Sequence, residues 1–155
     1  TAVDISLWLE EQVEATRLLA RELDVELDAA ALPPMLYVEL DRRTMPHAIT
    51  KLLRNAMKYA NARILVSAEV NDDSIRVHVD DDGIGIPDEE RERIFSPFTR
   101  LDRSRDRATG GYGLGLAIVQ LVLEQHHGAA SAGESPLGGA RFTLAWPLSQ
   151  NVTES

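Results

Sequence analysis

Apolar residues recur along the chain with two periods, which together predict a mixed α/β fold. A spacing of three to four residues, typical of one helix face, occurs in residues 5–22, 45–60 and 114–125. Alternation or short apolar runs predict strands at residues 25–27, 36–40, 63–70, 74–81, 129–132 and 141–146. Because helices and strands do not alternate regularly, we expect a two-layer α/β sandwich, in which helices cover one face of a mixed sheet.

Residues that favour turns indicate how these segments connect. Residues 71–73 predict a hairpin between two strands, and a loop containing Gly and Pro follows it at 82–87. A short helix with an acidic start is expected at 88–94, and Gly128 is expected to end the last helix. The stretch 96–113 is polar and rich in arginine, and loops of this length in compact domains are often lids or binding loops.

Composition and charge limit the classes of function. The length suits one domain, which we expect to span residues 1–149, with a disordered tail at 150–155. The absence of cysteine excludes disulfides and thiolate chemistry. The net charge of −9 argues against nucleic-acid binding, and no apolar run approaches the ~18–20 residues of a membrane span. The same charge repels a nucleotide at long range, so a nucleotide site would need local cations or backbone N–H groups.

A polar stripe accompanies the apolar one on the helix expected at 45–60. Lys51, Asn55, Lys58 and Tyr59 are spaced at i, i+4, i+7 and i+8, so they share one face. The amide oxygen of Asn55 is a hard, neutral ligand suited to Mg²⁺, and Lys58 has the reach to contact a phosphate. An ordinary solvated helix face is the alternative.

The strand expected at 74–81 ends in an aspartate that has the parity of an apolar position. Asp81 continues the side of the strand that carries Val77 and Val79. A buried carboxylate is costly unless it is hydrogen-bonded, and the exocyclic amine of adenine would satisfy it. Gly83 and Gly85 would let the backbone approach a flat ring. The alternatives are an Asp-Gly turn with surface carboxylates, or a cation site made by the three consecutive aspartates.

Glycines open the last expected helix, where residues 110–116 read GGYGLGL. A helix N-terminus offers free N–H groups and the positive end of its dipole to a phosphate. The spacing fits neither a Walker loop nor a dinucleotide fingerprint. Four arginines against two aspartates at 99–109 give the preceding stretch a local charge of about +2. A flexible glycine hinge is the alternative.

Taken in order, these motifs resemble the catalytic and ATP-binding domain of sensor histidine kinases, in the wider group that also holds gyrase, Hsp90 and MutL. The matching segments are LLRNAMKYA (52–60, the N box), DDGIGIP (81–87, G1), IFSPF (94–98, F), GGYGLGLAIV (110–119, G2) and LGGARFTL (137–144, the last glycine motif). The arginine-rich stretch and the final strand are also similar to the RstB-type sensor kinases. The resemblance covers roughly residues 4–148, and it implies the Bergerat ATP-binding fold with a flexible ATP lid.

The resemblance implies a role for each matching residue. Asn55 would hold Mg²⁺, and Asp81 would accept a hydrogen bond from the adenine amine. The other residues expected to bind ATP are Lys58, Tyr59, Gly83, Gly85, Ile86, Arg100, Arg105, Gly111, Gly113, Leu114, Gly115 and Leu116. Phe95 and Phe98 would anchor the lid on the core. ATP and Mg²⁺ are therefore the expected cofactors.

The resemblance also implies partners. The γ-phosphate would pass to a histidine on a separate phosphoacceptor and dimerisation domain of the same kinase, for relay to a response regulator. His47, His78, His126 and His127 all lack the following Glu and Pro of a phosphoacceptor helix, and His78 is expected on an exposed strand face. The chain does not begin with Met. We expect a fragment that is the cytoplasmic domain of an inner-membrane sensor and makes no direct membrane contact itself.

Two departures from the family pattern keep other functions open. Lys51 stands where the family usually has Asn or an acidic residue, and Ala140 stands where it often has Thr. One alternative is a degenerate nucleotide-binding or docking module without transfer activity, which Lys51 favours. The other is a related ATPase or serine kinase, although gyrase-type hydrolysis needs a carboxylate base at the position of Lys51.

Overall fold

The structure, a computed structural model, describes residues 1–96 and 112–149, with the side chains of 112–115 left out. A five-stranded mixed sheet has the strand order β2-β4-β5-β7-β6. Its strands are β2 (Asp24–Asp28), β4 (Arg63–Asn71), β5 (Ser74–Asp81), β6 (Ala129–Glu134) and β7 (Ala140–Pro147). β2 pairs with β4 in parallel, and all other neighbours in the sheet are antiparallel.

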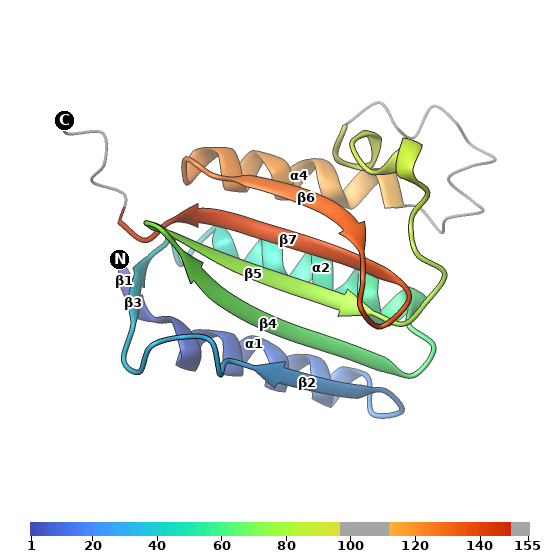
Figure 1. Cartoon of the computed structure of the whole chain (residues 1–155), viewed down its shortest axis with the longest axis horizontal. Helices are drawn as coiled ribbons and strands as arrows, with labels where there is room; N and C mark the ends of the chain where they lie inside the picture. Colours follow the sequence, from blue (N-terminus) through green and yellow to red (C-terminus); the bar gives the residue numbers. More distant parts are fainter. Residues whose placement is uncertain (97–111, 150–155) are drawn as a thin grey trace.

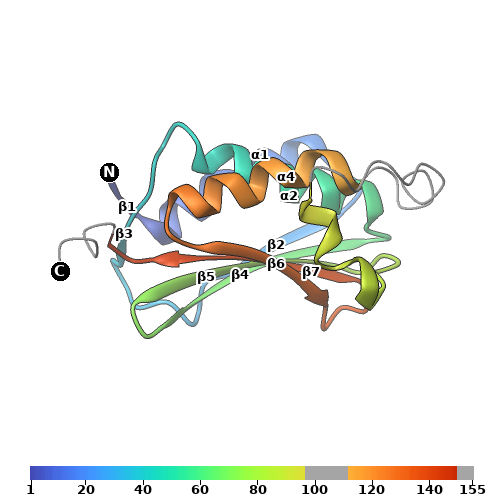
Figure 2. The same cartoon turned by 90° about the horizontal axis from the view of Figure 1, so that it is seen from above.

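Three helices lie on one face of this sheet, which we call the inner face (Figures 1 and 2). They are α1 (Ile5–Leu19), α2 (Met45–Tyr59) and α4 (Tyr112–Gln125). The predicted two-layer α/β sandwich is thereby confirmed. Within the described ranges, each helix is too short or too polar to cross a membrane.

The core lies between the helices and the inner face of the sheet. Its largest fully buried side chains include Trp146 and Phe142 from β7 and Leu52 from α2. The indole N–H of Trp146 donates to the carbonyl of Glu39 at 3.0 Å, which ties β7 to the strand β3 (Tyr37–Glu39). The central strands present alternating apolar side chains to the helices, as their period-two pattern predicted.

Several expected boundaries are wrong, each for a local reason. α1 ends at Leu19 and not at residue 22, because the chain turns at the buried Ala20 to reach β2. The helix expected at 88–94 is instead two 3₁₀ turns, η1 (Asp88–Glu90) and η2 (Arg93–Phe95). Short segments of this kind commonly adopt the tighter 3₁₀ form.

The end of α4 differs from the expected glycine cap. His127 takes the left-handed conformation with φ 63°, and the N–H of Gly128 donates to the carbonyl of Leu123 at 2.8 Å. A Cβ at Gly128 would lie less than 3.0 Å from Ala145 and Trp146 atoms. Close packing against β7, and not a positive φ, is therefore what requires glycine at this position.

The strand β1 (Ala2–Asp4) has no counterpart in the sequence prediction, although its partner β3 corresponds to the strand expected at 36–40. β1 pairs antiparallel with β3, with Val3 opposite Val38. Asp4 also caps α1, because its carboxylate accepts from the N–H of Leu7 at 3.3 Å. Three residues are too few to show a period, so this strand gave no signal in the pattern.

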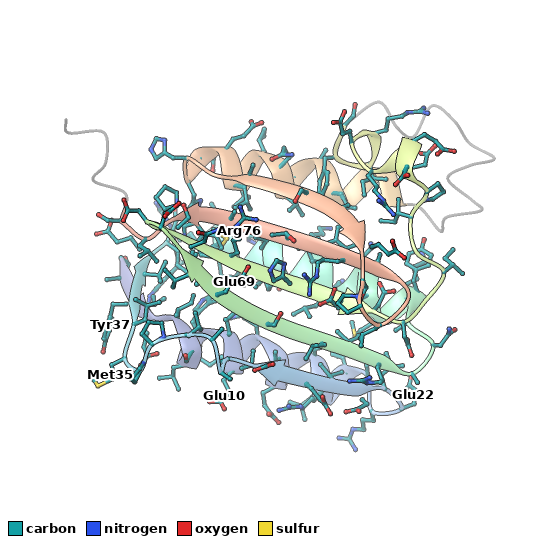
Figure 3. The ribbon with its side chains drawn as sticks, in the orientation of Figure 1. Glu10, Glu22, Met35, Tyr37, Glu69 and Arg76 are labelled. Carbon is teal, nitrogen blue, oxygen red and sulfur yellow. The ribbon has the colours of Figure 1, made fainter. Side chains whose placement is uncertain are left out.

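Among the described residues, the opposite, outer face of the sheet carries no helix, and this face is polar (Figures 2 and 3). Glu69 on β4 and Arg76 on β5 are opposite each other in the register of this face. The prediction that His78 is exposed on this face is wrong, because only 9% of the residue is exposed. Its ring lies between two side chains of the neighbouring strands, with Nδ1 2.8 Å from Thr143 Oγ1 and Nε2 3.4 Å from Glu69 Oε2.

Candidate functional site

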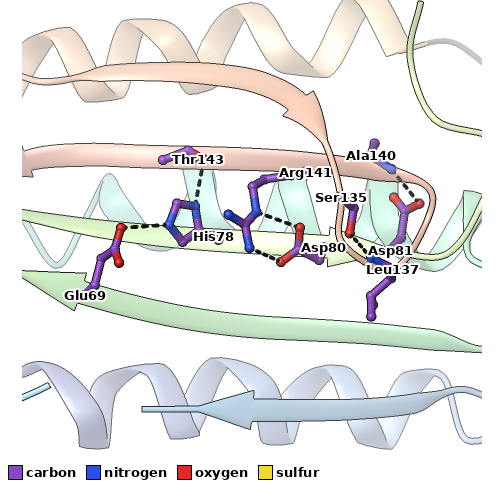
Figure 4. Close-up of polar contacts among 9 residues, drawn as sticks. All are labelled: Glu69, His78, Asp80, Asp81, Ser135, Leu137, Ala140, Arg141 and Thr143. Carbon is purple, nitrogen blue, oxygen red and sulfur yellow. Dashed lines mark hydrogen bonds and ion pairs between the residues drawn. The ribbon is translucent and has the colours of Figure 1, made fainter. Parts of the chain in front are cut away.

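The C-terminal end of β5 carries a buried carboxylate. Asp81 is 1% exposed and extends the inward side of the strand, as its parity predicted. Its Oδ1 accepts from the N–H of Gly83 at 2.9 Å and from the N–H of Ala140 at 3.2 Å, and Figure 4 shows the second of these bonds. Among the described residues, Oδ2 has no hydrogen-bond partner. One oxygen is thus fixed by the backbone while the other can accept from a ligand.

Burial raises the pKa of Asp81 above its ordinary value, because the ionised form is poorly solvated there. The N–H groups of Gly83 and Ala140 oppose this rise, and the nearby charges of Asp82 and Asp80 add to it. A buried acceptor of this kind gains from a donor that replaces the lost water. An exocyclic amine is such a donor.

Glycines allow the backbone to close tightly around this carboxylate. A Cβ at Gly139 would lie less than 3.0 Å from Asp81 Oδ1, the Asp81 carbonyl oxygen and the Gly83 nitrogen. A Cβ at Gly83 would meet the carbonyl of Tyr59 at the end of α2. Gly85 has φ +79°, a conformation that side-chain-bearing residues rarely adopt. The last glycine motif, the loop after β5 and the end of α2 therefore converge on Asp81.

The polar stripe of α2 lies on the same face of the sheet as Asp81. The amide nitrogen of Asn55 is buried and has no hydrogen-bond partner among the described residues. A buried amide nitrogen left without an acceptor is unusual, and this observation fits a residue whose N–H groups donate to a bound ligand. Lys51 is exposed on the same helix.

Tyr59 and Lys58 end this stripe. Burial raises the pKa of Tyr59 to about 12, so its phenol stays protonated at neutral pH. The Nζ of Lys58 lies 5.9 Å from the centroid of the Tyr59 ring. This pair places a cation beside a neutral aromatic surface at the end of α2.

Asp82 has a role that the sequence did not indicate. Its Oδ1 accepts from the N–H groups of Asn61 at 2.8 Å and Ala62 at 3.0 Å, which joins the loop after β5 to the turn after α2. Burial opposes ionisation, but the N–H groups of Ala62, Arg63 and Asn61 hold the pKa of Asp82 below its ordinary value. Only the fold brings this turn beside the loop, so local sequence gave no signal.

The remaining predicted residues divide between the core and parts outside the description. Ile86 and the side chain of Leu116 are buried in the core, and Phe95 packs edge-on against Phe142 with centroids 6.2 Å apart.

α4 begins at Tyr112 and not at residue 114, so Gly113, Leu114 and Gly115 lie within its first turn, where N–H groups lack intrahelical partners. Arg100, Arg105, Gly111 and Phe98 lie outside the described residues.

Ala140, which stands where the family often has threonine, contributes its backbone N–H to the site. Its N–H reaches Asp81 Oδ1 directly, and the N–H of Gly139 donates to the Asp81 carbonyl oxygen at 3.1 Å. The missing hydroxyl therefore does not leave the carboxylate without a donor from β7.

Comparison with known proteins places these features in context. Residues 40–150 match the model of the family described as histidine kinase-, DNA gyrase B- and HSP90-like ATPase. The chain is 39% identical to the sensor protein RstB of Escherichia coli K12 over 151 residues, which is 97% of this chain and 34% of RstB. It is 48% identical to the sensor histidine kinase CpxA of the same organism over 101 residues, 65% of this chain and 22% of CpxA.

Solved structures show the same arrangement of elements. The ATP-binding domain of PrrB from Mycobacterium tuberculosis superposes with a TM-score of 0.78 at 29% identity, covering 96% of this chain and 97% of that domain. Full-length ShkA in complex with AMPPNP gives a TM-score of 0.80 at 27% identity, covering 96% of this chain and 31% of ShkA. The chain thus spans about a third of the length of RstB and of ShkA.

Proposed function

Because the chain belongs to the family of histidine kinase-, DNA gyrase B- and HSP90-like ATPases, we propose that it is the ATP-binding catalytic domain of a sensor histidine kinase. In this role it binds Mg-ATP and transfers the γ-phosphate to a histidine on a separate phosphoacceptor and dimerisation domain of the same kinase. A response regulator then receives the phosphate. RstB and CpxA, which are named as sensor proteins, support the assignment.

One observation carries the proposal: the half-satisfied carboxylate of Asp81. Its Oδ1 is held by two backbone N–H groups, which leaves Oδ2 to accept from the N6 amine of adenine. Gly83 and Gly139 let the backbone close on this carboxylate, because a Cβ at either position would overlap neighbouring backbone atoms. Guanine has a carbonyl where adenine has the amine, so the same carboxylate would repel it.

Asn55 is the residue that would hold Mg²⁺ through its amide oxygen, a suitable hard ligand, while its buried amide nitrogen, which has no partner among the described residues, would donate to a phosphate oxygen. A bound Mg²⁺ would neutralise charge on the phosphates, which is the main requirement of phosphoryl transfer. Lys58 would contact a phosphate, and the neutral phenol of Tyr59 would donate to the nucleotide. The first turn of α4 would add backbone N–H groups.

Phosphate transfer to an added histidine-bearing domain tests the proposal. The purified chain, with Mg-ATP labelled in the γ-position, should label a dimerisation domain from a relative and should not label a His→Gln version of that domain. Tight ATP binding without transfer would favour a degenerate nucleotide-binding module. Steady ATP turnover by the isolated chain would favour a related ATPase.

We propose further that the parent protein is an inner-membrane sensor and that this domain lies in the cytoplasm.

Replacing Asn55 by Ala should abolish the Mg²⁺ dependence of nucleotide binding. Titration calorimetry should show ATP affinity falling about tenfold in Mg²⁺, equivalent to ~1.4 kcal/mol, and little change in EDTA. Arg54→Ala, an exposed neighbour on the same helix, is the matched control and should retain the full Mg²⁺ effect. Equal losses in Mg²⁺ and in EDTA would show that Asn55 does not hold the metal.

A further inference from the structure

An ion pair between a buried carboxylate and a partly exposed arginine lies on the outer face of the sheet, on the opposite side from the proposed nucleotide site. The Nε of Arg141 is 2.8 Å from Asp80 Oδ1, and its Nη2 is 3.0 Å from Asp80 Oδ2 (Figure 4). Asp80 is fully buried, and 31% of the Arg141 side chain is exposed. Bidentate pairs of this type fix geometry as well as charge.

The two residues of this pair are direct neighbours of the residues that build the site. Asp80 and Arg141 face each other in the register of β5 and β7. One step further along each strand, Asp81 and Ala140 turn to the inner face, where the Ala140 N–H bonds to the carboxylate. This is the end of the β5–β7 ladder, because Asp80 and Arg141 form its last register pair.

We propose that Asp80 and Arg141 are positioning residues for base recognition: their ion pair holds the start of β7 against the end of β5, and so keeps the Gly139 and Ala140 N–H groups on Asp81. The inference rests on the proposed role of Asp81 in binding adenine. Strand ends fray more readily than strand centres. The ion pair of Asp80 and Arg141, which we call the clamp, joins the two strands at their last register pair and so opposes this fraying. It thereby preserves the adjacent hydrogen bond from the Ala140 N–H to Asp81 Oδ1, which is long at 3.2 Å.

Charge supports the same conclusion. Asp80 is adjacent to Asp81, and its negative charge is one of the factors that raise the pKa of Asp81. The guanidinium of Arg141 is hydrogen-bonded to the Asp80 carboxylate and so compensates its negative charge. Asp80 in turn raises the pKa of that guanidinium through their hydrogen bonds. Without Arg141, an unpaired carboxylate would stand behind the one that has to remain ionised to accept from adenine.

The outer face also provides a matched control. His78 and Thr143 form the register pair next to Asp80 and Arg141 on the outer face of β5 and β7. Nδ1 of His78 and Oγ1 of Thr143 are 2.8 Å apart. This contact joins the same two strands on the same face but lies two residues further from Asp81 on β5. Thr143→Val removes it and should lower the melting temperature without changing base recognition.

Residue-resolved amide exchange of the nucleotide-free chain tests the clamp by itself. In Arg141→Met, the Gly139 and Ala140 N–H groups should exchange at least about tenfold faster, whereas in Thr143→Val they should exchange as in the unmodified protein. Arg141→Lys keeps the charge but not the bidentate geometry, so it should give an intermediate rate, and it replaces Arg141→Met if that variant does not fold. Unchanged exchange at both amides in the variants that fold would overturn the clamp.

Nucleotide titration then tests the consequence. The ratio of ATP to inosine triphosphate affinity should fall about tenfold in Arg141→Met, partly recover in Arg141→Lys and remain unchanged in Thr143→Val. A lower melting temperature with an unchanged ratio would overturn the positioning role and leave the proposed function intact. Faster exchange in Arg141→Met, combined with no preference for ATP in the unmodified protein, would instead overturn the proposed adenine contact of Asp81.

Discussion

Replacing Asp81 by Asn should weaken ATP binding about a hundredfold and partly transfer the preference to inosine triphosphate. The N–H groups of Gly83 and Ala140 both point at Oδ1, so the single carbonyl oxygen of an Asn would take that place. Its NH₂ group would then stand where, in our proposal, Oδ2 accepts from the adenine amine. When ATP binds, the NH₂ group of the Asn and the N6 amine of adenine would be two donors facing each other. The O6 carbonyl of hypoxanthine would instead accept a hydrogen bond from that NH₂ group.

The same substitution should stabilise the nucleotide-free fold. Burial, aided by the charges of Asp82 and Asp80, raises the pKa of Asp81 in spite of its two N–H donors. A carboxyl whose folded pKa is raised stabilises the fold below its unfolded pKa, and this contribution is lost as the pH rises through the folded pKa. At neutral pH the fold therefore carries an unfavourable buried charge, which Asn lacks. A gain on the order of 1 kcal/mol would raise the melting temperature by ~2–4 °C.

Calorimetric titration with both nucleotides, together with thermal melts, checks these two results. Asp88→Asn is the charge-matched control: it removes a carboxylate from the exposed start of η1, and the preference for ATP should persist. A higher melting temperature in Asp81→Asn would show that any loss of affinity does not come from misfolding. If Asp81→Asn binds ATP as tightly as the unmodified protein, the adenine contact lies elsewhere.

The inward aspartate could be predicted from sequence because its signal is local. Alternation along β5 places Asp81 on the same side as Val77 and Val79, and the structure buries it there. The same reasoning failed for His78. Its parity indicated the outer face correctly, but its burial depends on Glu69 and Thr143, which neighbouring strands supply.

Contacts between distant segments explain most of what the sequence could not provide. The pair of Asp80 with Arg141 joins residues 61 positions apart, and the register that aligns them is set by the packing of two whole strands. Asp82 reaches the turn after α2 only because that turn ends beside the loop after β5. Asn55, in contrast, could be proposed from spacing on one helix, where all neighbours are local. Motif order thus indicated the proposed site, while the groups that hold its backbone in place became visible only in the fold.

Replacing Gly139 by Ala should damage both the fold and the site. The new Cβ would lie less than 3.0 Å from Asp81 Oδ1, the Asp81 carbonyl oxygen and the Gly83 nitrogen, two of which are backbone atoms that cannot move independently. Overpacking of this kind typically costs ~1–3 kcal/mol. The relief available to the chain is to move β7 away from the end of β5, which would break the Gly139 and Ala140 bonds to Asp81.

We therefore expect Gly139→Ala to lower the melting temperature by several degrees and to weaken ATP binding at least about tenfold at a temperature where it remains folded. Gly133→Ala is the matched control on β6, because a Cβ there has nothing within 4 Å and needs no positive φ. Its stability should stay within ~0.5 kcal/mol of the unmodified protein, with unchanged affinity. Thermal melts and calorimetry on the two variants separate the effects. If Gly139→Ala behaves like Gly133→Ala, β7 does not press on Asp81, and the backbone donors assigned to that carboxylate cannot be what orients it.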